Sequence, residues 1–246
     1  MSLFTKIAKT AALGGATGLG TFLFLTRKNE FVPMNPSNSP LFHSRFAKSW
    51  NPNDNATTHD DCLRKVPLDQ IKPELLQKEG ELVRAFAAGV WSGPGELLRT
   101  NTDAQSRLTH LVRPFTGYIP QRTYLHKKYY GEKTKEQLWT PEQLKQSSYE
   151  VGTQLTDHFE VVERTPNSII VRCGDSPYNN DREMDGIFEF ATEVKRDEGV
   201  AEFHLRTVMW IVKGKTEKPP LNSVMQWLHQ QYDKLWMETG LWNVKQ

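Results

Sequence analysis

The feature that most constrains this chain is the segment 149–213, in which strand-like stretches alternate with turn residues. Two short stretches flank Thr165-Pro166-Asn167, and two longer ones flank Arg196-Asp197-Glu198-Gly199, which is the pattern of two β-hairpins. The predicted strands are 158–162, 168–173, 186–195 and 200–213. We therefore expect an antiparallel sheet at the centre of the domain.

The four-residue turn of the longer hairpin predicts which residues face each other across the two strands. It places Phe188 opposite Thr207 and Glu189 opposite Arg206, and side chains alternate between the faces of the sheet. The face expected to form core carries Phe188, Phe190, Thr192, Val194, Ala201, Phe203, Leu205 and Thr207. The other, mixed face carries Ile187, Glu189, Ala191, Glu193, Glu202, His204, Arg206 and Val208.

A long helix is predicted after the hairpins. Pro219-Pro220 ends the last strand, and apolar residues then recur at helical spacing from Leu221 to Trp236, with Gly240 as the predicted stop. Such a helix must bury its apolar stripe against the sheet. The predicted fold class is therefore α+β, with a curved antiparallel sheet wrapped on a long C-terminal helix.

Four features combine in the last part of the chain: the block 151–163, the turn into 169–175, the long hairpin and the final helix. In this combination the chain resembles the helix-grip fold of the START-like (SRPBCC) superfamily. The resemblance implies an apolar ligand cavity between sheet and helix, but no catalytic residue, because that superfamily has no shared catalytic set. The linker and domain also resemble small membrane-anchored proteins of fungal natural-product gene clusters.

The N-terminal residues 10–26 carry no charge, and basic residues stand on both sides of them. At ~1.5 Å per residue such a helix spans about 25 Å, the lower limit for a bilayer core. Residues 1–28 are therefore interpreted as an uncleaved single-pass anchor, with the endomembrane system favoured as location. A mitochondrial presequence and a cleaved signal peptide remain open as alternatives.

The stretch 29–66 is rich in Asn, Pro and Ser and is interpreted as a polar linker, which leaves 67–246 as the folded domain. Phe42, Phe46 and Trp50 stand at helical spacing, so a short docked helix at 44–49 is compatible with the pattern. Asn55-Ala56-Thr57 is a glycosylation sequon, and a glycan is expected on Asn55 if this exposed linker faces the lumen.

Two further helices are expected within the domain. One runs from Pro73 to Trp91 and stops at Ser92-Gly93-Pro94-Gly95, and the other begins with a capping box at Thr140 and runs through Ser148. Between them, 105–135 is basic and aromatic, which favours a solvated surface and leaves contact with an anionic bilayer open. Nucleic acid is not expected, because the formal net charge of the chain is only +2.

The candidate catalytic residues are polar side chains in the sheet. Glu189, His204 and Arg206 share the mixed face, where they form either a proton-transfer site or a simple cross-strand salt bridge. Asp157 and His158 are adjacent at the start of a predicted strand, so their side chains are expected to point to opposite faces.

No metal or cofactor site is predicted from the sequence. The histidines stand singly, and neither a Gly-rich nucleotide fingerprint nor a GxSxG nucleophile motif is present. Cys62 and Cys173 lack CxxC spacing and are expected to be separate buried thiols, although a disulfide remains open.

These features lead to the expectation of a membrane-anchored protein that handles a hydrophobic small molecule. The leading hypothesis is a cofactor-independent tailoring enzyme of isomerase, cyclase or dehydratase type in secondary-metabolite biosynthesis. A non-catalytic lipid or sterol transfer module and a mitochondrial inner-membrane assembly protein remain as alternatives. The discriminating observation is the cavity, because ionisable residues in its wall favour an enzyme.

Overall fold

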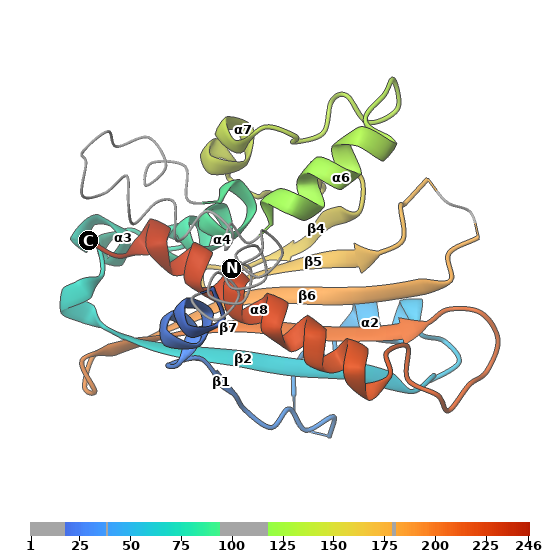
Figure 1. The fold of residues 1–246 in the computed structure, drawn as a ribbon, viewed down its shortest axis with the longest axis horizontal. Coiled ribbons are helices and arrows are strands. Elements are labelled where there is room, and N and C mark those ends of the chain that lie inside the picture. The colour runs from blue at the N-terminus through green and yellow to red at the C-terminus, as the bar shows by residue number, and fades with distance from the viewer. Residues whose placement is uncertain (1–17, 38, 94–117, 179–180) are drawn as a thin grey trace, which may run out of the picture.

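The fold is an antiparallel sheet of seven strands with helices on both of its faces (Figure 1). The computed structural model describes residues 18–37, 39–93, 118–178 and 181–246. The strands are β1 (Glu30–Phe31), β2 (Thr57–Pro67), β3 (Gln154–Leu155), β4 (Phe159–Arg164), β5 (Ser168–Gly174), β6 (Met184–Lys195) and β7 (Val200–Ile211). They lie in the order β1-β2-β7-β6-β5-β4-β3, and the α+β class expected from the sequence is confirmed.

The helices are α2 (Arg45–Trp50), α3 (Pro73–Gln77), α4 (Glu81–Ser92), α6 (Ile119–Tyr129), α7 (Pro141–Gln146) and α8 (Ser223–Val244), with a 3-10 turn η1 (Leu68–Gln70). Among the described helices, α8 is the longest, with 22 residues. Residues 18–26 are also helical. The capping box of α7 is formed as predicted, with Thr140 Oγ1 accepting from the Gln143 amide at 3.2 Å.

The predicted register of the long hairpin is confirmed. Phe188 pairs with Thr207 and Glu189 pairs with Arg206. The face that carries Phe188 and Phe190 belongs to the main core, as expected. The shorter hairpin of β4 and β5 also forms, with a bulge between Val161 and Glu163.

The main core lies between the sheet and the pair α4 and α8. Phe86 of α4 makes edge contacts with Phe190 and Phe203 of the sheet, with ring centroids 5.9 and 5.1 Å apart. Trp91 is fully buried, and its ring lies 5.3 Å from that of Trp236 on α8. These aromatic contacts fix both helices on the same face of the sheet.

Gly240 does not end the last helix, which corrects the prediction. The helix α8 continues to Val244, and a Cβ at position 240 would lie 2.5 Å from the ring of Phe86. Glycine is therefore required here for the close approach of α4 and α8. At this site packing, rather than helix termination, explains the residue.

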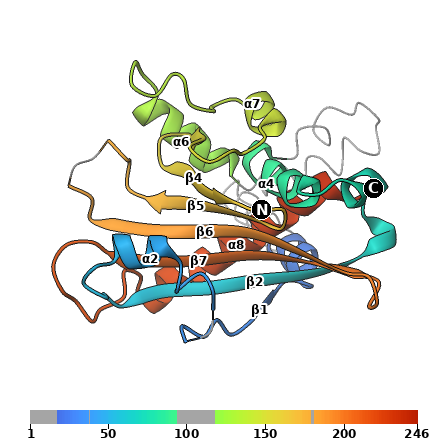
Figure 2. The same ribbon diagram turned by 180° about the vertical axis from the view of Figure 1, so that it is seen from behind.

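The other face of the sheet carries a second, smaller core under α2 (Figure 2). The helix that the aromatic spacing allowed at 44–49 is α2, capped by Ser44, and Phe46 belongs to this cluster together with Ile187 and Val208. The indole of Trp210 donates to the carbonyl oxygen of Trp50 at 2.9 Å. The sheet is therefore covered by apolar residues on both sides.

The interpretation of 29–66 as a linker is wrong. Its last part forms β2, which pairs with β7 along eleven residues and with β1 on its other side. The turn-forming Asn and Pro residues end at Asn55, and the strand follows directly. The sequence pattern does not predict β2, because a half-buried strand normally carries apolar residues on its inner face. In β2 the charged residues Asp60 and Arg64 are buried instead.

Asn55 is not part of an exposed linker. Only 2% of it is exposed, and its Nδ2 donates to the carbonyl oxygens of Ile211 and Gly214, each at 2.8 Å. Its Oδ1 accepts from the Thr216 amide. Attachment of a glycan to this nitrogen would require both hydrogen bonds to break, so the side chain serves here to hold the loop after β7.

Two predicted helices differ in extent from the observed ones. The segment 73–91 is divided into α3 and α4, because Gly80 adopts a left-handed conformation with φ of 79°. In α8, the first turns do not pack on the sheet as expected. Val224, Met225 and Leu228 are 65%, 49% and 47% exposed.

The predicted membrane anchor lies partly outside the described residues, which include 18–26 of the uncharged run 10–26 but not 10–17. Among the described residues, no helix combines the length and the apolar character that a membrane crossing requires.

The contact between α4 and α8 gives a test of the fold. A Cβ at Gly89 would lie 2.7 Å from Asn243 Cβ and 2.8 Å from the Gly240 carbonyl oxygen. We predict that Gly89→Ala lowers the free energy of unfolding by about 1–3 kcal/mol through overpacking. This cost exceeds the about 1 kcal/mol that alanine gains in helix propensity. The matched control is Gly131→Ala, where no atom lies within 4 Å. Urea denaturation measures both, and equal stabilities would contradict the prediction.

Candidate functional site

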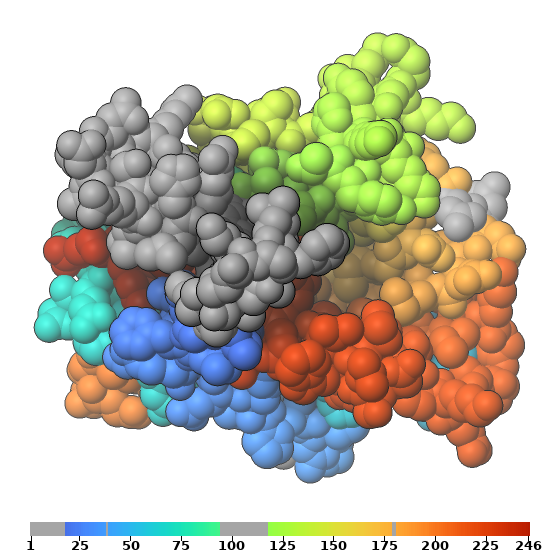
Figure 3. All heavy atoms as spheres, in the orientation of Figure 1, coloured from blue at the N-terminus to red at the C-terminus, as the bar shows by residue number. Residues whose placement is uncertain are grey.

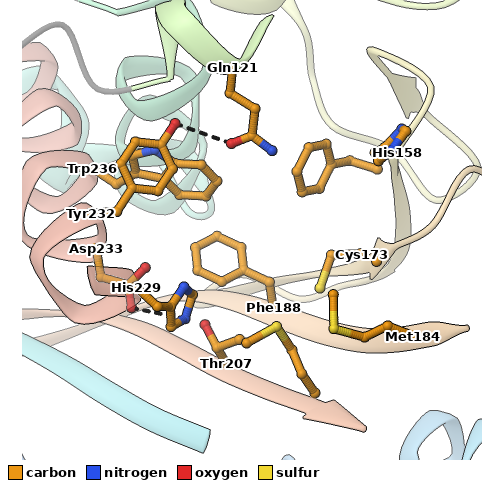
Figure 4. Close-up of a pocket in the computed structure, with 13 residues that line it drawn as sticks. Gln121, His158, Cys173, Met184, Phe188, Thr207, His229, Tyr232, Asp233 and Trp236 are labelled. Carbon is orange, nitrogen blue, oxygen red and sulfur yellow. Dashed lines mark hydrogen bonds and ion pairs between the residues drawn. The ribbon is translucent and has the colours of Figure 1, made fainter. Parts of the chain in front are cut away.

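A cavity of about 270 Å³ lies between α8, α6 and the sheet (Figure 4). Its walls come from elements far apart in the sequence. Lining residues are His158, Phe159, Cys173, Gly174, Met184, Phe188, Thr207 and Met209 on the sheet side, and Gln121, His229, Tyr232, Asp233 and Trp236 on the helical side. Most of the surface is apolar, which suits a hydrophobic ligand.

The helical side of the cavity has a defined polar rim. The Tyr232 hydroxyl donates to Gln121 Oε1 at 3.1 Å, which ties α8 to α6 across the cavity (Figure 4). Tyr232 also packs on Trp236, with ring centroids 5.1 Å apart. Burial raises the pKa of Tyr232 to about 12, so its hydroxyl keeps its proton at neutral pH.

A cluster of three ionisable residues lies at one end of the cavity. Asp60 of β2 pairs with Thr207 of β7, so both side chains point to the α8 side of the sheet. His229 and Asp233 stand one turn apart on α8. His229 Nε2 lies 3.3 Å from Asp233 Oδ2 and 3.7 Å from Asp60 Oδ2. We call Asp60, His229 and Asp233 the inner cluster.

Burial dominates the electrostatics of the inner cluster. Asp60 and Asp233 are only 5% and 1% exposed. Burial raises the pKa of Asp60 to about 7, and burial together with the nearby Asp60 raises that of Asp233 well above its usual range. Burial lowers the pKa of His229 to about 4, so its imidazole is neutral at neutral pH. Within the described residues, the carboxyl oxygens of Asp60 accept no hydrogen bond, and His229 Nε2 and Asp233 Oδ2 meet only in a poorly aligned contact.

Three of the predicted catalytic residues lie on the opposite face of the sheet from the cavity. Arg206 donates to Glu189 at 2.9 Å and to Asp61 at 3.0 Å, and His204 Nδ1 lies 2.9 Å from Asp61. Ser168 donates to Glu189 as well. These residues form the cross-strand ion-pair network that was the alternative interpretation of Glu189, His204 and Arg206.

The other predicted pair, Asp157 and His158, lies at the edge of the cavity. The two side chains do not point to opposite faces, because His158 Nδ1 lies 2.8 Å from Asp157 Oδ2. Thr156 and Asp157 have φ of 50° and 70°, so they form a left-handed turn before β4 begins at Phe159. The alternation rule of strands does not apply within such a turn.

The inner cluster itself was not predicted. Asp60 lies in the segment expected to be a linker, and His229 and Asp233 lie in a helix that is predicted from its apolar residues. The spacing of His229 and Asp233 predicts that they share a helix face, because residues four apart lie one turn from each other. That Asp60 joins them follows only from the pairing of β2 with β7.

The two cysteines are free and buried. Both belong to the main core, and Cys173 also lines the cavity. Burial raises the pKa of Cys173 to about 12 and that of Cys62 still further above its usual range. Neither thiol is therefore prepared to act as a nucleophile at neutral pH.

The comparisons with known proteins give no match: no protein-family model, no curated protein and no solved structure is similar to this chain.

The different positions of the cysteines predict an order of thiol reactivity. Attack requires the thiolate, so both native thiols should react slowly with an aromatic disulfide reagent and rapidly in denaturant. Cys173, with 8% exposure and access from the cavity, should react before Cys62, which has none. Peptide mass spectrometry after timed labelling measures the order, and modification of Cys62 first would contradict the placement of the cavity.

Proposed function

We propose that the protein binds a hydrophobic small molecule in the cavity between α8 and the sheet. The observation that carries this proposal is the cavity, with apolar walls supplied by Phe188, Met209 and Trp236. A ligand pocket at this place is what the resemblance to the START-like helix-grip fold implies. In that interpretation, the antiparallel sheet corresponds to the curved sheet of the helix-grip fold, and α8 to its long helix.

The nature of the cavity wall favours an enzyme over a passive carrier. A carrier of lipid needs only apolar walls, whereas His229 and Asp233 place ionisable groups at the surface of this cavity. Buried carboxyl groups are costly in free energy, and functional sites are where such groups gather. We infer that a carbonyl or unsaturated group of the ligand lies against these residues, as a tailoring reaction in secondary metabolism requires.

Blocking the cavity tests ligand binding directly. We predict that Cys173→Phe fills space in the cavity and reduces the amount of apolar ligand that co-purifies with the full chain. Native mass spectrometry of the protein extracted from its host measures that amount. The matched control is Val194→Phe, which adds the same ring at a position that does not line the cavity. Equal ligand content in the two variants, or none in the parent, would contradict the proposal.

The second part of the proposal is a membrane-facing surface beside the cavity. The first turns of α8 and the helical residues 18–26 lie on the same side of the molecule (Figure 3). The exposed apolar residues there are Leu19, Leu23, Phe24, Val224, Met225, Trp227 and Leu228. Just after the helical residues 18–26, Asn29 Nδ2 donates to the Lys234 carbonyl oxygen in the middle of α8 at 3.3 Å.

A lipid bilayer is the proposed partner of this surface. The helical residues 18–26, which carry Leu19 and Phe24, are the second part of the uncharged run 10–26, and Arg27 and Lys28 follow at its end. Basic residues at the end of an apolar segment are attracted to anionic headgroups. With α8 at the bilayer, an apolar ligand reaches the cavity without crossing water.

Fluorescence quenching tests the contact with the bilayer. Trp227 is 58% exposed on α8, and Trp50 lies behind the sheet in the smaller core. In vesicles with brominated acyl chains, the fluorescence of the full chain should be quenched by contact between Trp227 and lipid. Trp227→Phe should remove most of this quenching, and the matched variant Trp50→Phe should retain it. Undiminished quenching in Trp227→Phe would show that this face does not contact lipid.

A further inference from the structure

The inner cluster lacks a compensating positive charge. Among the residues that the structure describes, no Lys or Arg lies within ion-pair distance of Asp60 or Asp233, and the only neighbouring base is His229. By contrast, the buried Arg64 is paired with Glu238 at 3.1 Å on the same side of the sheet. Two buried carboxyl groups without a cation are rare, since desolvation of each is costly.

A shared proton between Asp60 and Asp233 would satisfy only part of this cluster. One proton can bridge one oxygen of each carboxyl group. Among the residues that the structure describes, the remaining oxygen of Asp60 would still have no hydrogen-bond partner, and His229 Nε2 would keep only its poorly aligned contact with Asp233 Oδ2. Thr207 Oγ1, which lines the cavity beside them, has no hydrogen-bond partner among these residues either. These buried atoms all belong to side chains that face a single region.

We propose that Asp60, His229 and Asp233 bind one divalent transition-metal ion at the wall of the cavity. One ligand atom from each side chain lies within 4.8 Å of the others, so a small ion fits among them with little movement. The two carboxylates balance its charge, and the neutral imidazole supplies a nitrogen ligand. The proposal rests on these three side chains alone and does not require the ligand of the cavity.

The donor set determines the class of ion. Two carboxylate oxygens and one imidazole nitrogen suit Zn²⁺, Mn²⁺, Fe²⁺ or Co²⁺, whereas Mg²⁺ and Ca²⁺ prefer oxygen donors alone. Three protein ligands leave positions open, as in catalytic rather than structural metal sites. His229 and Asp233 line the cavity, so the open positions face it, and Thr207 is placed to hydrogen-bond a water on the ion.

Together with the proposed function, on which this step rests, the metal site defines the chemistry that the cavity could perform. A divalent ion acts as a Lewis acid that polarises a carbonyl oxygen or lowers the pKa of a bound water. The substrate class would then be a hydrophobic molecule that carries a carbonyl or hydroxyl group near one end. Such a molecule places its polar end on the ion and its apolar body against Phe188 and Trp236.

Cobalt binding tests the site in the absence of any ligand. The full chain is treated with a chelator, and Co²⁺ is then titrated while its visible absorption is recorded. We expect one equivalent to bind. Asp233→Asn and His229→Gln should each weaken binding by more than about 100-fold, because loss of even an outer partner costs about 10–100-fold. The matched controls, Asp61→Asn and His204→Gln, change the same residue types on the opposite face and should bind as the parent does.

A second measurement needs no variant. In the parent, Co²⁺ should protect His229 from diethyl pyrocarbonate and leave the exposed His43 reactive. A parent that binds no Co²⁺, or that binds it equally after Asp233→Asn, overturns the proposal and leaves a shared proton as the explanation. Ligand content in chelator-treated protein is measured separately, so failure of the metal site and failure of the ligand cavity are distinguishable.

Discussion

The close contact of α4 with α8 is the constraint on which the rest of the structure depends. Gly89 and Gly240 let the two helix backbones approach, and the Phe86 ring occupies the space beside Gly240. This contact holds the second half of α8 against the sheet, where Trp236, Met237 and Leu241 are buried. The first half of α8 is less buried. The cavity lies between α8 and the sheet and is lined by His229, Tyr232, Asp233 and Trp236 of this helix.

The pairing of β2 with β7 decides which charges meet the cavity. Asp60 and Asp61 are neighbours in a strand, so their side chains point to opposite faces. Asp60 faces Thr207 and α8, and Asp61 meets Arg206 on the other side. A shift of this strand by one residue would exchange the two carboxyl groups. The register of β2 therefore decides which of the two carboxyl groups stands beside His229 and Asp233.

Local patterns in the sequence were sufficient for the hairpins and for several helix ends. The turn at 196–199 predicts the register of β6 and β7, and Thr140 caps the helix expected to follow it. Long-range pairing could not be predicted in this way. The strand β2 lies far in sequence from β7, and its buried charges are explained only by partners on other elements, such as Glu238 for Arg64. The role of Gly240 likewise depends on a residue far away in the sequence, Phe86, so local pattern alone predicts a helix stop there.

The inner cluster differs from the network of Asp61, Glu189, His204 and Arg206 on the opposite face of the sheet in its charge balance more than in its residue types. Both clusters hold carboxyl groups and a histidine. On the outer face, Arg206 lies between Asp61 and Glu189, and most donors and acceptors are paired. This network stabilises the sheet and needs no further partner. The inner cluster has two buried carboxyl groups, no arginine or lysine within the described residues, and several unpartnered atoms. The alternation of side chains along β6 and β7 is sufficient to predict that Glu189, His204 and Arg206 share one face of the sheet. The inner cluster is recognised only from the pairing of β2 with β7 and from its burial, and a bound cation is the form of charge neutralisation that we propose for it.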